Sequence, residues 1–171
     1  GGQRPRDGQP VQGHGGLMGQ GARRQGRELA LKVLYSLYDH DMEIDFILKD
    51  FWDNFRFRDD VLGEPIEDVS KSVPAHVQAF AETLIRGVVN HLSEIDAVID
   101  KHSTNWALER MARVDLSLLR LSVFELLYLP DVPANVAINE AIEIGKRYGT
   151  KDTPPFINGI LDKISQQAEK K

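Results

Sequence analysis

The stretch from Met111 to Leu129 is apolar on nearly all sides and is followed by Pro130, which cannot continue a helix. A helix without a polar face is stable in water only when other elements surround it. We therefore predict that this stretch forms the central helix of a bundle. Its most apolar part, Leu116 to Leu129, is only 14 residues long, too short for a membrane span, and carries Arg120 and Glu125, so no membrane segment is expected.

Other segments repeat apolar residues at three- and four-residue steps, the pattern of helices that bury one face. The longest, from Ser72 to Val98, keeps its stripe for roughly seven turns and predicts one continuous helix, the spine of the fold. No segment alternates apolar and polar residues as a half-buried strand does, which disfavours an α/β fold. The predicted fold class is all-α, a bundle of about seven helices. The remaining striped segments are 22–37, 43–55, 133–149 and 153–164.

Two regions differ from the helical segments in composition. Residues 1–21 hold eight glycines and two prolines with few large apolar side chains, so we expect a disordered tail. The segment around Gly63 and Pro65 is rich in acidic residues and is predicted to be a loop. The tail has no continuous apolar core of the kind that a secretory signal needs. Residues 22–168 are therefore expected to form a single folded domain.

The residue types and spacings that enzymes use are missing from the sequence. The chain has no cysteine, which excludes disulfides and thiolate metal sites and fits the cytoplasm. No glycine-rich loop follows a predicted strand, and no glutamate precedes a histidine by three residues as in di-iron bundles. We expect no catalytic residue, no metal and no cofactor. The histidines are scattered among polar surroundings, at His14, His40, His76, His91 and His102.

The net charge of −5 is unevenly distributed along the chain. Residues 1–38 carry six basic and two acidic side chains, whereas residues 39–68 carry three basic and eleven acidic ones. Arg23, Arg24 and Arg27 fall on the first turns of the first predicted helix, where guanidinium groups can pair with phosphates and stack on bases. This cluster predicts a polyanion-binding site. The competing interpretation is a solvated helix start, with Arg24 linked to Glu28 at four-residue spacing.

Three motifs in the second half of the chain carry a family resemblance. They are LRLSVFEL from Leu119 to Leu126, VPANVAINEAIE from Val132 to Glu143, and FINGILDK from Phe156 to Lys163. In this order they resemble the NusB family of transcription antitermination factors, and the resemblance extends from about Ala22 to Ile164. It implies two three-helix bundles packed side by side, which would divide the chain into sub-bundles of roughly residues 22–100 and 101–168.

The resemblance also implies a function without catalysis. Family members pair with NusE, a ribosomal protein of the small subunit, and the pair binds the boxA element of nascent ribosomal RNA leaders as a single strand. The bound complex then joins the RNA polymerase antitermination complex. A homodimer is a further expectation for some members, and the apolar stripes of this chain fit either a core or an interface.

The resemblance assigns roles to particular residues by position. The arginine-rich start would contact RNA, although Gln25 stands where the family has a further arginine. The turn before the last helix would form a second RNA-facing element. The expected RNA-binding residues are Arg23, Arg24, Arg27, Lys146, Tyr148, Asp152 and Phe156, and the residues expected on the RNA or partner surface are Tyr35 and Asp115.

Each of these assignments has a structural alternative. Phe156 fits a core residue, Asp152 a helix cap, and Tyr35 packing between helices. Two other functions also stay open for the whole chain. The first is an accessory domain of an RNA cytosine methyltransferase, since some of these enzymes begin with a NusB-like region. The second is a helical scaffold that binds only protein.

Overall fold

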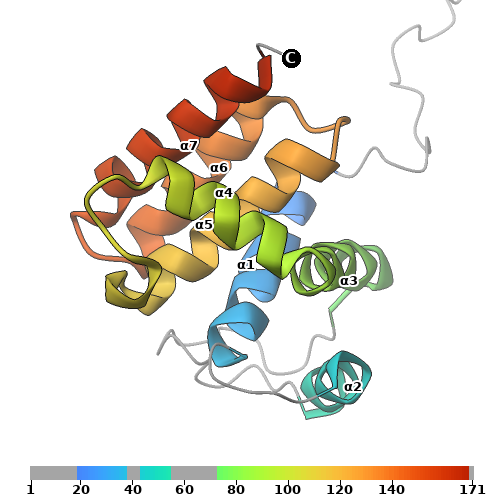
Figure 1. Ribbon diagram of the computed structural model, residues 1–171. Coiled ribbons are helices and arrows are strands. Elements are labelled where there is room, and N and C mark those ends of the chain that lie inside the picture. Colours follow the sequence, from blue (N-terminus) through green and yellow to red (C-terminus); the bar gives the residue numbers. More distant parts are fainter. Residues whose placement is uncertain (1–18, 38–42, 55–72, 170–171) are drawn as a thin grey trace, which may run out of the picture.

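A computed structural model describes residues 19–37, 43–54 and 73–169 of the protein. Within these ranges the chain forms seven α-helices and one short 3₁₀ helix, with no strand, which confirms the predicted all-α class (Figure 1). Most of the predicted tail and the predicted acidic loop lie outside the described residues. The elements are α1 (Gln20–Ser36), α2 (Ile44–Asn54), α3 (Ala75–Asn90), α4 (Leu92–His102), η1 (Leu108–Arg110), α5 (Arg113–Tyr128), α6 (Ala134–Tyr148) and α7 (Thr153–Glu169).

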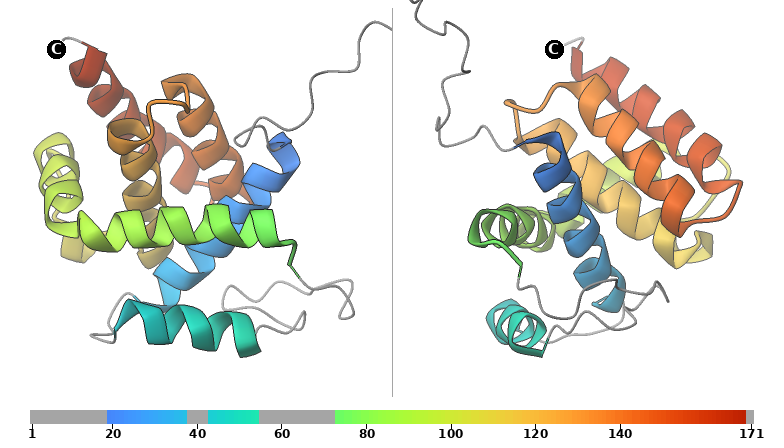
Figure 2. Two further views of the ribbon diagram at one scale, coloured as in Figure 1. Left: turned by 90° about the vertical axis from the view of Figure 1, so that its right-hand side faces the viewer. Right: turned by 180° about the vertical axis from the view of Figure 1, so that it is seen from behind.

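Helix α5 lies at the centre of the fold, as its apolar sequence predicts. It packs against α1, α3, α4, α6 and α7, and Figures 1 and 2 show these helices arranged around it. Leu118, Leu119 and Val123 are completely buried. Helices α5, α6 and α7 also pack on one another, and α1 and α3 form a second group with α5. No helix in the described part of the chain is long and apolar enough to cross a membrane.

The predicted spine is wrong in one respect, because it is two helices rather than one. Helix α3 ends at Asn90 and α4 begins at Leu92, with His91 at φ −118° and ψ 21° between them. Figure 2 shows that the two helices run in different directions. The His91 ring stacks on Tyr128 of α5, with 4.1 Å between ring centroids, which favours the corner. The apolar stripe gave no sign of this break, because residues on both sides of it face the same core.

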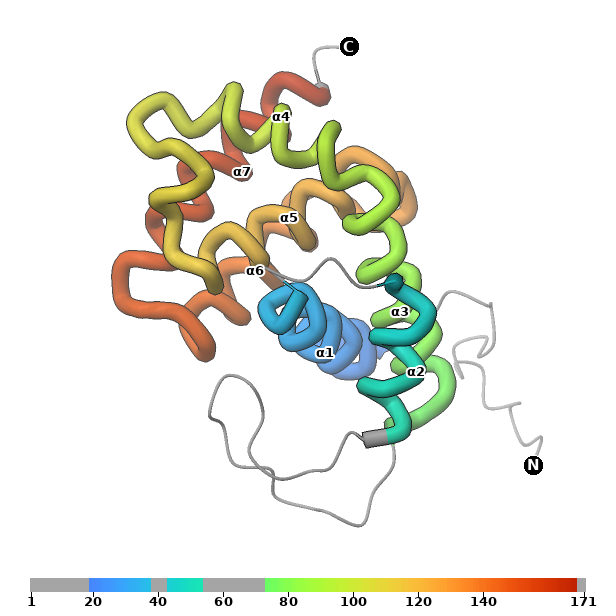
Figure 3. Tube along the Cα trace, turned by 60° about the horizontal axis from the view of Figure 1, so that its bottom comes forward, coloured from blue at the N-terminus to red at the C-terminus, as the bar shows by residue number. Residues whose placement is uncertain are grey.

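Helix α3 approaches α5 closely at a glycine. A Cβ atom added at Gly87 would overlap the buried ring of Phe124. Only a residue without a side chain lets the two backbones come this near. Helix α2 lies at the edge of the fold beside α3 (Figure 3), where the Trp52 Nε1–H donates to Glu82 at 2.8 Å.

We expect replacement of Gly87 by alanine to lower the unfolding free energy by about 1 to 3 kcal/mol, the usual cost of overpacking a core. Gly159, which lies exposed within α7, is the matched control because nothing is within 4 Å of its added Cβ. Gly159→Ala should raise stability by up to about 1 kcal/mol through helix propensity alone. Urea denaturation measures both values. A Gly87→Ala variant as stable as the wild type would contradict the close packing.

Candidate nucleic-acid interface

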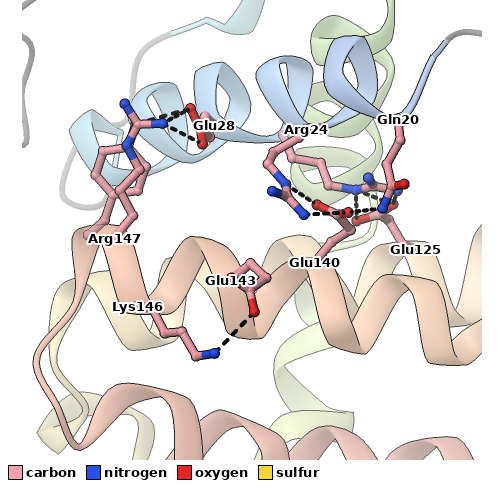
Figure 4. Close-up of polar contacts among 10 residues, drawn as sticks. Gln20, Arg24, Glu28, Glu125, Glu140, Glu143, Lys146 and Arg147 are labelled. Carbon is pink, nitrogen blue, oxygen red and sulfur yellow. Dashed lines mark hydrogen bonds and ion pairs between the residues drawn. The ribbon is translucent and has the colours of Figure 1, made fainter.

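Long side chains bridge α1 and α6, which run side by side in the same direction. Figure 4 shows Arg24 reaching Glu140 and Arg147 reaching back to Glu28. One turn further along α1, the Lys32 Nζ lies 5.7 Å from the centroid of the Tyr148 ring. We call this line of residues the α1–α6 seam: Arg24, Glu28 and Lys32 of α1 with Glu140, Arg147 and Tyr148 of α6.

The Arg24 side chain is accessible at the surface, although it has a partner. Its Nε donates to Glu140 Oε2 at 2.7 Å and its Nη2 donates to Oε1 at 3.0 Å. Burial alone would raise the pKa of Glu140, but hydrogen bonds from Arg24 and Gln20 hold it below its ordinary value. The Arg24 side chain is still 42% exposed. A guanidinium has five N–H donors, and those of Nη1 are not used by Glu140.

Arg27 lies in the core instead of at the surface. It is 1% exposed, and its Nε and Nη2 donate to the carboxylate of Glu125 at 2.8 to 3.0 Å. Burial raises the pKa of Glu125, while the hydrogen bonds and the charge of Arg27 oppose that rise. In this structure Arg27 presents no exposed guanidinium to a ligand. Its predicted contact with RNA stays a prediction and would require α1 to separate from α5.

Arg23 and Gln25 flank Arg24 on the same helix. Arg23 is half-buried, with its guanidinium carbon 5.8 Å from the centroid of Phe80 on α3. Gln25, the position at which the sequence departs from the family pattern, is exposed. The arginine cluster is therefore divided by depth, from buried to accessible, rather than forming one cationic surface.

The C-terminal end of α6 adds two of the other predicted residues. Lys146 is exposed and its Nζ donates to Glu143 at 3.1 Å. Tyr148 is half-buried, and its hydroxyl donates to Glu28 Oε2 at 3.2 Å. The guanidinium carbon of Arg147 lies 5.3 Å from the same ring. A basic edge and an aromatic ring therefore lie together at this end of the seam.

The turn between α6 and α7 brings the next predicted residues together. Thr153 is buried and its hydroxyl donates to Asp115 Oδ1 at 2.7 Å, so Asp115 holds the turn to the start of α5. Asp152 is exposed, and its carbonyl accepts the Phe156 N–H at 3.2 Å. Phe156 is half-buried and packs partly against the core. Sequence reasoning had left open whether Phe156 is a core or a surface residue, and the structure gives it both properties.

Tyr35 lies at the other end of α1 from the arginines. It is half-buried, its carbonyl accepts a hydrogen bond from Arg113 Nε at 2.8 Å, and its ring lies 4.6 Å from the Arg113 guanidinium carbon. These contacts support the packing alternative for Tyr35. They leave its role on a partner surface untested.

The sequence interpretation missed the acidic partners of the arginines, Glu125 and Glu140. One signal was present, because Glu125 is a charged residue inside an otherwise apolar helix and such a residue needs a partner. Glu140 carried no such signal. Within the described ranges, no three His, Cys, Asp or Glu side chains are placed to hold a metal ion.

We expect Arg27→Met to lower the unfolding free energy by about 3 to 5 kcal/mol at neutral pH, because Glu125 would be buried without its counter-charge. The loss should shrink in acid. The folded-state pKa of Glu125 is already raised, so its ionisation opposes folding, and stability falls as pH rises through that value. Removing Arg27 strengthens this trend.

Urea denaturation of the wild type and Arg27→Met at about pH 5 and about pH 8 measures the difference. The double variant Arg27→Met with Glu125→Leu is the control, and it should regain most of the lost stability because neither charge remains. An equal loss at both pH values, or no recovery in the double variant, would contradict the buried pair.

Comparison with known proteins places this arrangement in one family. Residues 24–166 match the NusB family. The transcription antitermination protein NusB of Syntrophotalea carbinolica is 60% identical over 149 residues, which cover 87% of this chain and 95% of that protein. The corresponding protein of Geotalea uraniireducens is 49% identical over 146 residues, covering 84% of this chain and 94% of its own length.

Solved structures share the fold. NusB of T. maritima is 35% identical with a TM-score of 0.68, covering 85% of this chain and 91% of that one. A crystal structure of antitermination factors NusB and NusE in complex with double-stranded RNA contains a chain that is 22% identical, with a TM-score of 0.70 and coverage of 87% and 99%. At that identity the likeness concerns the fold alone. The family match over residues 24–166 and the 60% identity together show that this chain belongs to the NusB family.

Proposed function

We propose that this chain is a non-enzymatic, RNA-binding transcription antitermination factor that acts in the cytoplasm. In this proposal it pairs with NusE, and the pair binds the boxA element of nascent ribosomal RNA leaders and joins the RNA polymerase antitermination complex. The observation that carries the proposal is the α1–α6 seam, where Arg24, Arg147 and the Tyr148 ring lie along one line. The solved complex of NusB, NusE and RNA supports the partners.

The ion pairs of the seam are compatible with RNA binding. An exposed pair contributes only about 0 to 1 kcal/mol, so a phosphate can replace or share such a carboxylate at small cost. Lys146 and Glu143 form a pair of this kind, and Arg147 is also exposed, although its partner Glu28 is only 13% exposed. Arg24 differs because Glu140 is buried, so we expect Arg24 to keep that contact and to meet a phosphate through its remaining donors.

The competing candidate is a helical scaffold that binds only protein. The pairing of Arg24 and Arg27 with the protein's own carboxylates favours it, because these guanidinium groups are partly or wholly neutralised. The two functions differ in a measurable quantity. For binding through phosphates, the logarithm of the binding constant falls linearly with the logarithm of salt concentration. A scaffold that binds only protein would bind a boxA-like RNA no more tightly than a scrambled RNA.

We expect Arg24→Ala to weaken binding of a boxA-like oligonucleotide and to reduce the log–log salt slope by about 0.7, the value for one phosphate contact on a single strand. Fluorescence titration at several salt concentrations, with and without NusE, measures both. Arg27 is left intact in this test because its loss would disturb the core.

Arg86→Ala is the matched control. Arg86 on α3 is also 42% exposed and is also paired, with Asp45 of α2 at 2.6 Å, so its removal changes the net charge equally. The RNA affinity and the log–log salt slope of Arg86→Ala should stay close to the wild-type values. If Arg24→Ala and Arg86→Ala weaken RNA binding equally, the effect comes from net charge and not from the α1–α6 seam. If the wild type shows no sequence-dependent RNA binding even with NusE, the scaffold is favoured.

A further inference from the structure

Trp106 is a large aromatic side chain that stays exposed at the surface. It lies in the connection between α4 and η1, and it is 51% exposed. Its backbone N–H donates to the Ser103 carbonyl at 3.3 Å, so the residue is part of an ordered turn. A tryptophan buries more apolar area than any other residue when it packs inside a protein. The fold leaves much of that area in water at this position.

Phe156 of α7 supports the Trp106 ring. The two rings meet at 84°, edge to face, with 6.4 Å between centroids. Phe156 itself packs partly against the core and is held in the first turn of α7 by its bond to Asp152. In an edge-to-face pair at least one face of each ring is not covered by the other ring. The pair therefore offers an aromatic face that is fixed in place and open to a planar ligand.

Exposed charged side chains of both signs belong to the elements beside this aromatic pair, with Glu109 next to Arg110 and Asp152 next to Lys151. Lys151 lies in the α6–α7 turn and Arg110 in η1, both exposed. Neither side chain forms an ion pair or hydrogen bond within the described part of the chain. Figures 1 and 3 show that the α6–α7 turn and the connection after α4 lie at the same end of the molecule.

Within the described ranges, one other aromatic residue is strongly exposed, and its surroundings differ. Phe46 on α2 is 59% exposed, but Asp45, Asp50 and Asp53 belong to the same short helix. The acids of α2 outnumber Lys49 and would repel an anionic ligand, whereas Glu109 and Asp152 near Trp106 are matched by Arg110 and Lys151. The charge around Trp106 is therefore balanced, and a ligand with a flat face and negative charge is not repelled there as it is beside Phe46.

We propose that Trp106, supported by Phe156, stacks on an unpaired base of a single-stranded RNA. The inference rests on the proposed function, in which the α1–α6 seam holds the same strand by its phosphates. Tyr148 ends α6, and only the short turn with Lys151 separates it from α7, so a strand that leaves the seam passes directly to the aromatic pair. Only an unpaired base exposes its faces to a ring in this way, and such stacking tolerates any base.

The first experiment compares three variants in titrations with a labelled boxA-like single strand. Trp106→Leu removes the aromatic face and should weaken binding roughly tenfold, as expected for one lost stack. Trp106→Phe keeps a ring and should recover most of the affinity. Phe46→Leu is the matched control and should bind like the wild type. The salt slope should be unchanged in all three, because stacking releases no counterions.

The second experiment uses the tryptophan as its own reporter. In a Trp52→Phe variant, Trp106 is the only tryptophan left, and its fluorescence should be quenched as the RNA saturates the protein. Thermal unfolding of each variant verifies that the fold is intact.

The outcomes separate this inference from the proposed function. RNA binding that depends on Arg24 but is the same in Trp106→Leu, without quenching, overturns the stacking role and leaves the function standing. Loss of NusE binding with unchanged RNA binding assigns Trp106 to a protein contact and also overturns it. If the wild type binds no RNA, both the stacking role of Trp106 and the proposed function are contradicted.

Discussion

The buried ion pair between Arg27 and Glu125 determines where α1 lies on the central helix. Both side chains are almost completely enclosed, and the guanidinium uses two of its nitrogens on one carboxylate. Desolvating two charges is costly and is offset only when their geometry is good, so α1 is held in one rotational position against α5. That position directs the next side chain facing α6, Arg24, toward Glu140, and places Glu28 opposite Arg147.

The same arrangement explains why the arginine cluster is not uniform. Residues three positions apart on a helix share a face, so Arg24 and Arg27 both point toward α5 and α6. The deeper one becomes structural and the shallower one stays accessible at the seam. The basic start of the chain therefore contributes to stability and to the proposed RNA interface through neighbouring residues, and a substitution has different meanings at the two positions.

The sequence was informative wherever the property depends on neighbours along the chain. Apolar spacing predicted the central helix and most of the other helices, since each helix buries a face that its own residues define. It failed at His91, because the stripes of α3 and α4 face a common core and continue across the corner. It also failed for Arg27 and Glu125, which are 98 positions apart, since no local pattern records which carboxylate a guanidinium meets. The start of the last helix at Thr153 was predicted correctly, although the turn expected to reach Phe156 ends at Asp152. Trp106, whose ring contacts Phe156, drew no attention because its exposure depends on how α4 and α7 are placed.

The contact of Gly87 with Phe124 has a consequence for how proteins of this fold diverge. The space that the Phe124 ring occupies is the space that a side chain at position 87 would need. The two positions thus share a single volume, and a larger residue at one is tolerated only with a smaller residue at the other. In relatives with a larger side chain at position 87, we expect a smaller side chain at position 124. The two positions then change together while the distance between α3 and α5 is kept.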